Sequence, residues 1–440
     1  MSGSTRKLSL DKITIFWFRR DLRLTDNHGL YEALRSGQPV LPIFIFDPDI
    51  LDSLKDKKDK RVNFIYRQLQ LIQKELLQKN SSLYVLHGRP LACFEKLIQD
   101  WEIGAVYTNH DYEPYAIQRD QEINSFLLKH SIPFHSFKDQ VIFEKEEITK
   151  SDGKPYTIYT PYSKSWKEKY FSEKKVRYPS EKHLDHLWKT KPFPFPAISQ
   201  LGFDEISIYF PSIQLNKEII LHYEETRNLP GMEGTSRMSL HLRFGTVSIR
   251  ELAASASKWN ETWLNELIWR EFFMMILFHF PQVVTESFKS KYDRIPWRNN
   301  EKEFTLWCKG ETGYPLVDAG MRELNETGFM HNRVRMVVAS FLTKHLLIDW
   351  RWGEAYFAEK LLDYELSSNN GNWQWCAGCG CDAAPYFRIF NPITQQEKFD
   401  PDFIYVKRWI PGFQPGYLPL IVDHEMARER ALAVYKKALQ

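Results

Sequence analysis

The sequence predicts two folded domains joined by a long connector: a doubly wound, Rossmann-like parallel α/β domain and then an all-helical domain. Two observations predict this order. Short apolar runs alternate with helical periodicity in the first third of the chain, and helical periodicity alone follows a proline-rich middle. We expect the α/β domain over residues 10–135, the connector over 136–212 and the helical domain over 213–440.

The predicted strands of the first domain are four apolar runs rich in β-branched and aromatic residues, at 13–18, 40–46, 83–86 and 104–108. Between the second and third runs, residues 62–79 carry apolar side chains at helical spacing. Strands that are apolar along nearly their whole length are typical of a parallel sheet covered on both faces. No Gly-x-Gly-x-x-Gly segment follows the first strand, so the pattern does not support a dinucleotide-binding half.

The middle of the chain shows no sustained periodicity. Prolines cluster at positions 155, 161, 179, 192, 194, 196 and 211, which indicates a connector running over the surface. Beyond it, the periodicity predicts helices at 216–227, 249–257, 262–279, 315–327 and 334–348.

The composition is that of a globular protein, with 43% hydrophobic residues, 26% charged residues and a formal net charge of +3. The first twelve residues are polar, and no apolar run approaches the ~20 residues of a membrane span, so we expect neither export nor membrane insertion. Five cysteines in 440 residues favour a reducing, cytoplasmic location. The small net charge neither requires nor excludes a nucleic-acid partner.

Three of the cysteines lie close together as Cys376-x-x-Cys379-x-Cys381. The spacing could begin a zinc or iron–sulfur site, but a structural zinc site needs four ligands and only Cys308 and scattered histidines are left to complete it. We therefore expect small residues packed in a tight glycine-rich turn, and no metal.

Polar side chains interrupt the most apolar predicted helix, 262–279. Glu266, Trp269 and Arg270 fall at helical positions i, i+3 and i+4, on one face of that helix. A buried carboxylate must be paired or hydrogen-bonded. Two interpretations follow: an internal Glu266–Arg270 ion pair, or a polar patch that faces a bound ligand.

Three further segments concentrate reactive or ligand-binding residue types. Residues 363–375 hold two acids, adjacent asparagines and two tryptophans, and Asn332, Arg333 and Met336 share a helix face. Residues 233–239 combine Gly, Thr, Ser and Arg in a short segment whose backbone N–H groups and hydroxyls could hold a phosphate.

Five long segments, at 18–30, 233–248, 265–273, 312–336 and 370–392, resemble the photolyase/cryptochrome family in order and spacing. They begin FRRDLRLTDNHGL, EGTSRMSLH, NELIWREFF, TGYPLVDAG and NGNWQWCAG, and the match is most similar to class I cyclobutane pyrimidine dimer photolyases. The resemblance implies an N-terminal α/β antenna domain and a C-terminal helical domain that binds FAD.

The resemblance also implies a set of FAD-binding residues. The phosphates are expected at Thr235, Ser236, Arg237, Met238 and Ser239, and the rest of the pocket is expected to be formed by Tyr223, Trp263, Glu266, Arg270, Asn332, Arg335, Asp363, Glu365 and Asn369. Asp363 would pair with Arg335, and Asn369 would face the flavin N5. Glu365 stands where much of the family has aspartate.

The residues implied to bind the damaged DNA are Glu266, Trp269, Asn332, Arg333, Met336 and Trp375, with Arg227 and Arg388 at flanking phosphates. Glu266, Asn369 and Met336 are the implied catalytic residues. Trp297, Trp350 and Trp373 stand at the family's electron-relay positions. A single buried tryptophan is usually core packing, but three at matching positions favour a relay.

The implied function is light-dependent DNA repair. Reduced FAD (FADH−) transfers an electron to a flipped-out pyrimidine dimer in UV-damaged DNA and splits it into two pyrimidines. We expect a monomer, nucleoid-associated if the source is bacterial. The alternative is a cryptochrome-type blue-light photoreceptor, but Asn369, Trp269, Trp375, Asn332 and Met336 match the repair enzymes.

An antenna chromophore is also implied for the α/β domain. Tyr115 and Ala116 stand where folate-binding relatives have an Asn-Glu pair, so a deazaflavin, a second flavin or an empty pocket remain open.

Overall fold

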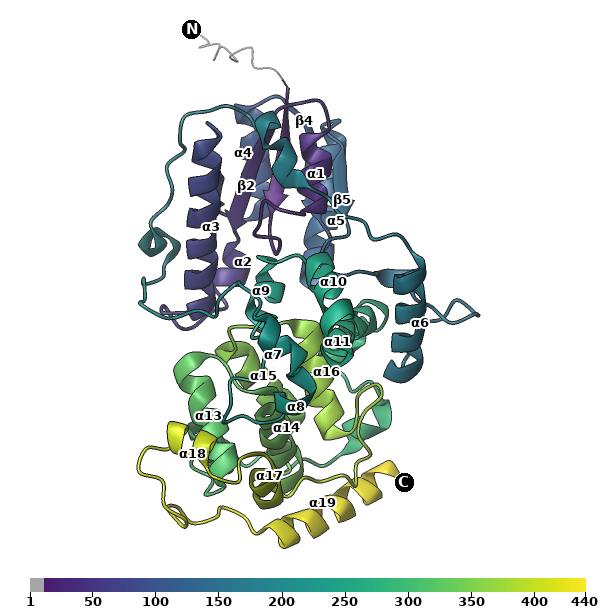
Figure 1. Cartoon of the computed structure of the whole chain (residues 1–440), viewed down its shortest axis with the longest axis vertical. Coiled ribbons are helices and arrows are strands. Elements are labelled where there is room, and N and C mark those ends of the chain that lie inside the picture. Colours follow the sequence, from purple (N-terminus) through teal and green to yellow (C-terminus); the bar gives the residue numbers. More distant parts are fainter. Residues whose placement is uncertain (1–11) are drawn as a thin grey trace. The chain divides into compact units, whose positions relative to one another are not determined.

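The computed structural model describes residues 12–440. The polar first residues, from which we expect no export, lie outside this range. The chain forms two compact units, which Figure 1 colours along the sequence. Unit 1 contains the chain up to Glu144, Glu173–Ile213 and Met238–Ala254. Unit 2 contains Lys145–Ser172, Gln214–Arg237 and Ser255–Gln440. The segment expected as a connector is therefore divided between the two units.

Unit 1 is built on a five-stranded parallel sheet of order β3-β2-β1-β4-β5. Its strands are β1 (Ile13–Phe18), β2 (Val40–Phe46), β3 (Tyr84–His87), β4 (Ile103–Asn109) and β5 (Phe134–Phe137). Every residue of β1 and β2 is buried, as expected for central parallel strands. The predicted doubly wound fold is confirmed. The sequence analysis missed β5, an edge strand without a fully buried residue.

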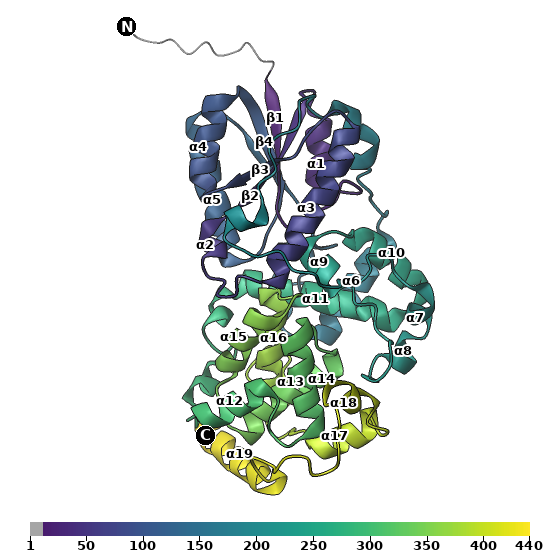
Figure 2. The ribbon, with the colours of Figure 1, turned by 90° about the vertical axis from the view of Figure 1, so that its left-hand side faces the viewer.

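Helices cover both faces of this sheet (Figure 2): α1 (His28–Leu34) and α3 (Lys60–Gln78) on one face, α4 (Pro90–Asp100) and α5 (Pro114–Lys129) on the other. Asp59 caps α3 by accepting a hydrogen bond from the Arg61 backbone N–H, and proline begins α4 and α5. The unit also contains α2 (Pro48–Leu51), the 3₁₀ turns η2 (Ser180–His186) and η3 (Ile198–Leu201), α9 (Ser239–Phe244) and the start of α10 (Ile249–Trp259).

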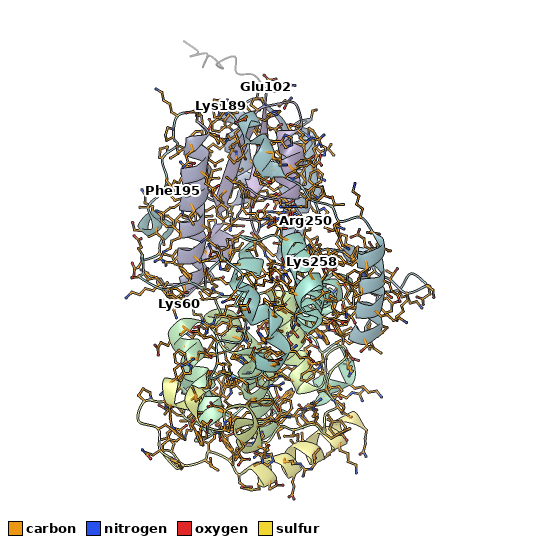
Figure 3. The ribbon with its side chains drawn as sticks, viewed as in Figure 1. Lys60, Glu102, Lys189, Phe195, Arg250 and Lys258 are labelled. Carbon is orange, nitrogen blue, oxygen red and sulfur yellow. The ribbon has the colours of Figure 1, made fainter. Side chains whose placement is uncertain are left out.

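A buried charge network attaches the start of α10 to the rest of unit 1. Arg250, labelled in Figure 3, lies with its Nε 3.0 Å from Asp26 Oδ2 and its Nη2 2.8 Å from Asp139 Oδ1. Arg23 Nη2 reaches the other Asp139 oxygen at 2.7 Å. Because these charges are buried, each needs the others, and together they hold the start of α10 against the first segment of unit 1.

Unit 2 is helical. Its longer helices are α6 (Tyr159–Ser172), α11 (Glu261–His279), α12 (Glu301–Lys309), α13 (Pro315–Thr327), α14 (Asn332–Ser340), α15 (Trp350–Lys360), α16 (Leu366–Ala377), α17 (Pro392–Phe399) and α19 (His424–Leu439). Shorter elements are η1 (Lys145–Glu147), α7 (Lys217–Leu221), α8 (Tyr223–Thr226), η4 (Pro281–Val284), η5 (Ser290–Arg294), η6 (Phe341–His345) and α18 (Ile404–Trp409). No described helix is long and apolar enough to cross a membrane.

Three predicted segments differ from the structure. The helix expected over 216–227 is broken at His222 into α7 and α8. The helix expected over 334–348 ends at Ser340 and continues as the π turn η6. The expected connector contains the 14-residue helix α6, which buries three aromatic residues. Its amphipathic pattern is too weak to predict a helix from the sequence.

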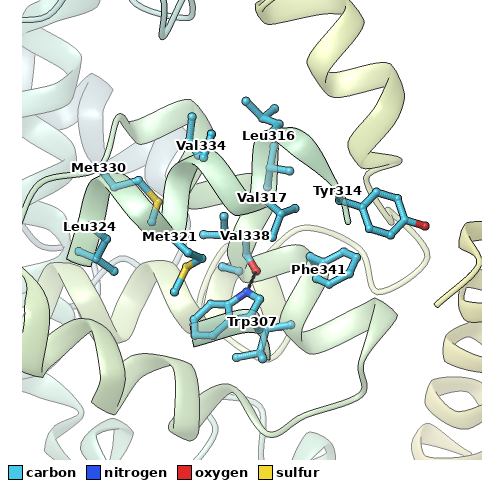
Figure 4. Packing of buried hydrophobic residues seen from close by; sticks show 14 of the residues in the cluster. Trp307, Tyr314, Leu316, Val317, Met321, Leu324, Met330, Val334, Val338 and Phe341 are labelled. Carbon is cyan, nitrogen blue, oxygen red and sulfur yellow. Dashed lines mark hydrogen bonds between the residues drawn. The ribbon is translucent and has the colours of Figure 1, made fainter. Parts of the chain in front are cut away.

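The core of unit 2 forms where α13 and α14 pack around Trp307 (Figure 4). The Trp307 indole is fully buried, and its Nε1–H donates to the Val338 carbonyl at 3.2 Å, which satisfies its polar atom. Gly320 allows the two helices to approach closely, because a Cβ there would lie 2.3 Å from Val334 Cγ1. This core supports α14, α15 and α16, which carry eight of the predicted site residues: Asn332, Arg333, Arg335, Met336, Trp350, Asn369, Trp373 and Trp375.

Candidate functional site

Helix α11 presents two charged side chains that pair with other segments of unit 2. Glu266 Oε1 lies 2.6 Å from Arg227 Nη1, and Arg270 Nη2 donates to Glu365 Oε1 at 3.1 Å. Both pairs are largely withdrawn from solvent. The alternative of an internal Glu266–Arg270 ion pair is wrong, because packing gives each charge a partner from a different element.

Glu266 is the carboxyl group that this arrangement perturbs most clearly. Burial raises its pKa, and the nearby Arg227 guanidinium offsets only part of that effect. The Arg227 guanidinium also lies 5.4 Å from the centre of the Tyr223 ring. A half-buried carboxyl with a raised pKa can hold a proton and donate it in a hydrogen bond to a ligand.

A third ion pair joins α14 to the segment before α16. Arg335 Nη2 donates to both Asp363 oxygens, at 2.9 and 3.2 Å, and Arg335 Nε donates to the Met330 carbonyl at 2.7 Å. The structure thus brings together the two residues that the resemblance predicts as a pair. The guanidinium is held at three points, so its direction is set by the protein alone.

Asn369 on α16 is oriented by α15. Its Nδ2 donates to Glu354 Oε1 at 2.8 Å and to the Glu354 carbonyl at 3.0 Å. Both amide protons are used in these bonds, so the hydrogen-bonding capacity that remains is that of the acceptor Oδ1. Burial raises the pKa of the Glu354 carboxyl, and the bond from Asn369 opposes this shift.

The predicted phosphate-binding segment begins in unit 2 with a close backbone approach. A Cβ on Gly234 would lie 2.5 Å from the Thr226 Cβ, so only glycine fits there. Thr235, Ser236 and Arg237 are half-buried, and Arg237 adopts a left-handed φ of 51°. Met238 and Ser239 belong to unit 1, where Met238 is buried and Ser239 begins α9.

His331 provides an independent indication of an anion site. Burial and the positive charges of Arg335, Arg333, Arg237 and Arg227 lower its pKa to about 4. Its Nδ1 accepts from the Arg333 backbone N–H, so the neutral ring carries its proton on Nε2. That buried Nε2 lacks a hydrogen-bond partner among the described residues. An orphaned donor among arginines fits a dinucleotide phosphate, so the residues present are compatible with FAD.

The predicted lesion residues are spread over α8, α11, α14, α16 and the loop before α17. Trp269 is half-buried and stacks on Tyr159, with ring centres 3.6 Å apart and an interplanar angle of 5°. Arg333 donates to Asn228 Oδ1 at 2.8 Å and lies 4.3 Å from the centre of the Phe399 ring. Met336 and Trp375 are half-buried, and Asn332 and Arg388 are exposed.

The three predicted relay tryptophans differ in burial. Trp373 and Trp350 are buried in the core of unit 2, and Trp297 is half-buried against Tyr435, with ring centres 5.9 Å apart. Trp373 packs directly on Gly353, one turn beyond Trp350 on α15, since a Cβ there would lie 2.1 Å from its ring. Trp263 is buried at the start of α11, where Asn260 caps the helix by accepting from its N–H.

The three clustered cysteines serve as small packing residues. Burial raises the pKa of Cys376, Cys379 and Cys381 to about 12, which keeps the thiols protonated and unreactive. Over residues 12–440 the structure shows no group of three His, Cys, Asp or Glu side chains placed to hold a metal.

Sequence reasoning missed Tyr159, Asn228, His331 and Glu354, all of which contact or orient predicted site residues. Tyr159 lies in the segment without periodicity, where no local signal marks it. Glu354 lies four residues after Trp350 on α15, and residues at this spacing share a helix face. Its nearness to a predicted relay residue is the one feature of the sequence that could have identified it.

Two family models match most of the chain: "DNA photolyase" over residues 14–180 and "FAD binding domain of DNA photolyase" over residues 263–415. A protein of Synechococcus named deoxyribodipyrimidine photo-lyase is 37% identical over 96% of both chains. The chain belongs to the DNA photolyase family. Membership in this family confirms the resemblance found in the sequence.

Solved structures of relatives share the whole fold. A photolyase from the archaeon Sulfolobus tokodaii, solved with two FAD molecules, is 34% identical and has a TM-score of 0.82 over 97% of this chain and 100% of that chain. A cryptochrome from Synechocystis is 26% identical, with a TM-score of 0.83 over the same shares. Because a repair enzyme and a cryptochrome fit equally well, the fold of the DNA photolyase family does not by itself separate the two activities.

Proposed function

We propose that the protein is a deoxyribodipyrimidine photolyase, which uses light and reduced FAD to split pyrimidine dimers in UV-damaged DNA. The observation that carries this proposal is the 37% identity to a deoxyribodipyrimidine photo-lyase over 96% of both chains. At that level of identity across whole chains, the helical unit and its polar contacts are expected to serve the same chemistry.

FAD, when bound and reduced, supplies the light-excited electron that opens the cyclobutane ring. Thr235, Ser236 and Arg237 would hold its phosphates, with His331 Nε2–H as a further donor. The Arg335–Asp363 and Arg270–Glu365 pairs would form polar walls of the same site. Asn369, with both amide protons donated to Glu354, would present Oδ1 as an acceptor to the flavin N5–H.

The dimer is expected to leave the DNA stack and enter the site, where Trp269 and Trp375 offer aromatic surfaces worth about 1–3 kcal/mol per stacked base. Glu266, whose pKa is raised by burial, would donate a hydrogen bond to the dimer carbonyls as they gain electron density. Arg227, Arg333 and Arg388 would contact phosphates beside the lesion.

The direct test is repair in solution. Purified protein with one FAD per chain, reduced without oxygen and illuminated with near-UV or blue light, is expected to restore the 260 nm absorbance of UV-irradiated oligo(dT). A dark sample is the control. A fully loaded, reduced and illuminated sample that leaves the dimers intact would contradict the proposal and favour the cryptochrome-type alternative.

An antenna chromophore in unit 1 extends the proposal. Tyr115 is the second residue of α5 and donates its hydroxyl hydrogen to Asp47 at the N-terminus of α2, and the next residue, Ala116, is buried. Neither residue offers the amide and carboxylate of the folate-binding pattern, so the alternatives are a deazaflavin, a second flavin or an empty pocket. The absorption spectrum of chromophores released from purified protein distinguishes these.

Cytoplasmic localisation, nucleoid association and a monomeric state complete the proposal. Size-exclusion chromatography with light scattering tests the monomer, and fluorescence microscopy of a tagged chain tests localisation.

A further inference from the structure

Tyr159 occupies one face of Trp269, a residue that the proposed function assigns to stacking on the dimer. The two rings are nearly parallel, at 5°, with centres 3.6 Å apart. Trp269 is only half-buried, so Tyr159 covers part of its surface while another part stays exposed. A stacked aromatic neighbour at this distance restricts the rotation of the indole and limits a ligand to the uncovered surface.

Tyr159 is itself fixed at three points within unit 2. Its hydroxyl donates to the Asn265 carbonyl at 2.9 Å, one turn before Trp269 on α11. Its backbone N–H donates to Asp382 Oδ2 at 3.1 Å, in the turn that follows α16. Its ring also packs edge-on against Phe272, with centres 5.9 Å apart. The contacts therefore join the elements that carry Trp269 and Trp375.

The helix behind Tyr159 is anchored separately. Figure 1 shows α6 beside α11, and the two helices pack together. Trp166 Nε1 donates to Glu271 Oε1 at 2.5 Å, and Tyr162 packs on Phe272 with ring centres 5.2 Å apart. Glu271 is buried, so its bond from Trp166 is costly to break. A ring held in this way is a fixed support and is poorly suited to move aside for a ligand.

We propose that Tyr159 is a positioning residue of the lesion site: it backs Trp269 and holds the indole in the orientation that stacks on a pyrimidine dimer. The proposal rests on the proposed function. It predicts a selective effect on damaged DNA, because an indole set in advance loses less conformational freedom when the dimer binds.

The test measures dark binding of two single-stranded oligonucleotides of one sequence, one with a single thymine dimer and one undamaged, by fluorescence anisotropy. Single strands remove the cost of opening a duplex. Tyr159→Leu is expected to weaken dimer binding about ten-fold, within the range for loss of one base–aromatic stack, and to leave binding of the undamaged strand nearly unchanged. Tyr159→Phe, which keeps the ring, is expected to restore most of the preference.

Tyr170→Leu is the matched control. Tyr170 is buried on the same helix and stacks on Trp166 with ring centres 4.8 Å apart, so its loss weakens α6 packing without removing the ring on Trp269. FAD content and thermal unfolding are measured for every variant. If Tyr159→Leu and Tyr170→Leu lose the same amount of dimer binding, the effect of Tyr159 comes from general packing of α6, and the proposal is overturned.

Two other results would also overturn it. Unchanged dimer preference in a folded, FAD-loaded Tyr159→Leu protein would show that Trp269 needs no support. Tighter dimer binding by that variant would show that Tyr159 blocks the site. A wild-type protein without any preference for the dimer would contradict the proposed repair function itself. A wild-type preference that Tyr159→Leu leaves unchanged would contradict only the role of Tyr159, so the two outcomes can be told apart.

Discussion

Asn369 Nδ2 donates to Glu354 Oε1 at 2.8 Å, and this contact between α16 and α15 decides which end of the amide can meet a ligand. A second bond to the Glu354 carbonyl, at 3.0 Å, uses the other amide proton. The Oδ1 atom is then the free end of the side chain. An acceptor beside the flavin N5 favours the protonated, reduced cofactor, so we expect Glu354 to act on FAD through Asn369.

Replacing Glu354 is therefore expected to lower the midpoint potential of bound FAD. In Glu354→Leu the side-chain bond that orients Asn369 is lost. If about 1.4 kcal/mol of hydrogen bonding to the reduced flavin is lost, the two-electron potential falls by about 30 mV. Redox titration with a reference dye measures the shift. Glu359→Gln, on the same helix and exposed, is the control, and an equal shift in both variants would contradict this role.

Glu266 is expected to make repair depend on pH. Because burial raises its pKa, the protonated carboxyl persists above its usual range, and it is lost as pH rises through the raised value. The repair yield per absorbed photon should fall over that range in the wild type. Glu266→Gln, which keeps a donor at every pH, should show a flat profile.

Glu266→Ala removes the same donor altogether. Its repair yield is expected to fall about ten-fold, the factor for loss of roughly 1.4 kcal/mol of hydrogen bonding in the reacting state, with FAD content retained. A wild-type yield independent of pH together with an unchanged alanine variant would remove Glu266 from the reaction.

Trp373 is expected to serve photoreduction and not repair itself. Trp373→Phe keeps an aromatic ring in the core, although it lacks the outer indole atoms that pack on Gly353. It is much harder to oxidise, so light-driven reduction of oxidised FAD should slow markedly. Chemically reduced Trp373→Phe should still repair dimers. Trp352→Phe, on α15 and packed on Phe304, is the matched control, and equal photoreduction in Trp373→Phe and wild type would exclude the relay role.

Lys344 is expected to destabilise the folded state at neutral and lower pH. Its buried ammonium donates to the Ala377 carbonyl at 2.9 Å and lies 3.7 Å from the centre of the Tyr435 ring, and burial lowers its pKa from 10.5 to about 7. Between pH 7 and 10.5 the unfolded chain binds more protons than the folded chain, so this group makes stability rise with pH.

Lys344→Met should abolish that contribution and raise the free energy of unfolding at pH 6 by about 1–3 kcal/mol, with a smaller gain at pH 9. Urea denaturation at the two pH values measures it, and Lys302→Met, at an exposed lysine, is the control. An equal gain at the two pH values would show that the pKa of the buried group is not lowered, and a larger gain at pH 9 than at pH 6 would show that it is raised.

The sequence by itself determined the kind of fold and the residues of interest. Central strands such as β1 and β2 are apolar along their length, and the apolar residues of helices such as α3 and α13 repeat every 3.6 residues, so both are local signals that short windows of sequence contain. Long motifs identified the family. The same reasoning missed β5 and α6, because an edge strand and a weakly amphipathic helix have no strong period.

Tertiary structure decided the partners. Helical spacing places Glu266 and Arg270 within reach of one another, yet Glu266 pairs with Arg227, and Arg270 pairs with Glu365, 95 residues away. Tyr159 lies on Trp269, and Glu354 orients Asn369, although nothing local to either residue indicates it. The physical reason is that a buried charge or amide must be paired, and tertiary packing decides which group lies close enough to pair with it. Spacing in the sequence identifies only the neighbours within one helix or strand.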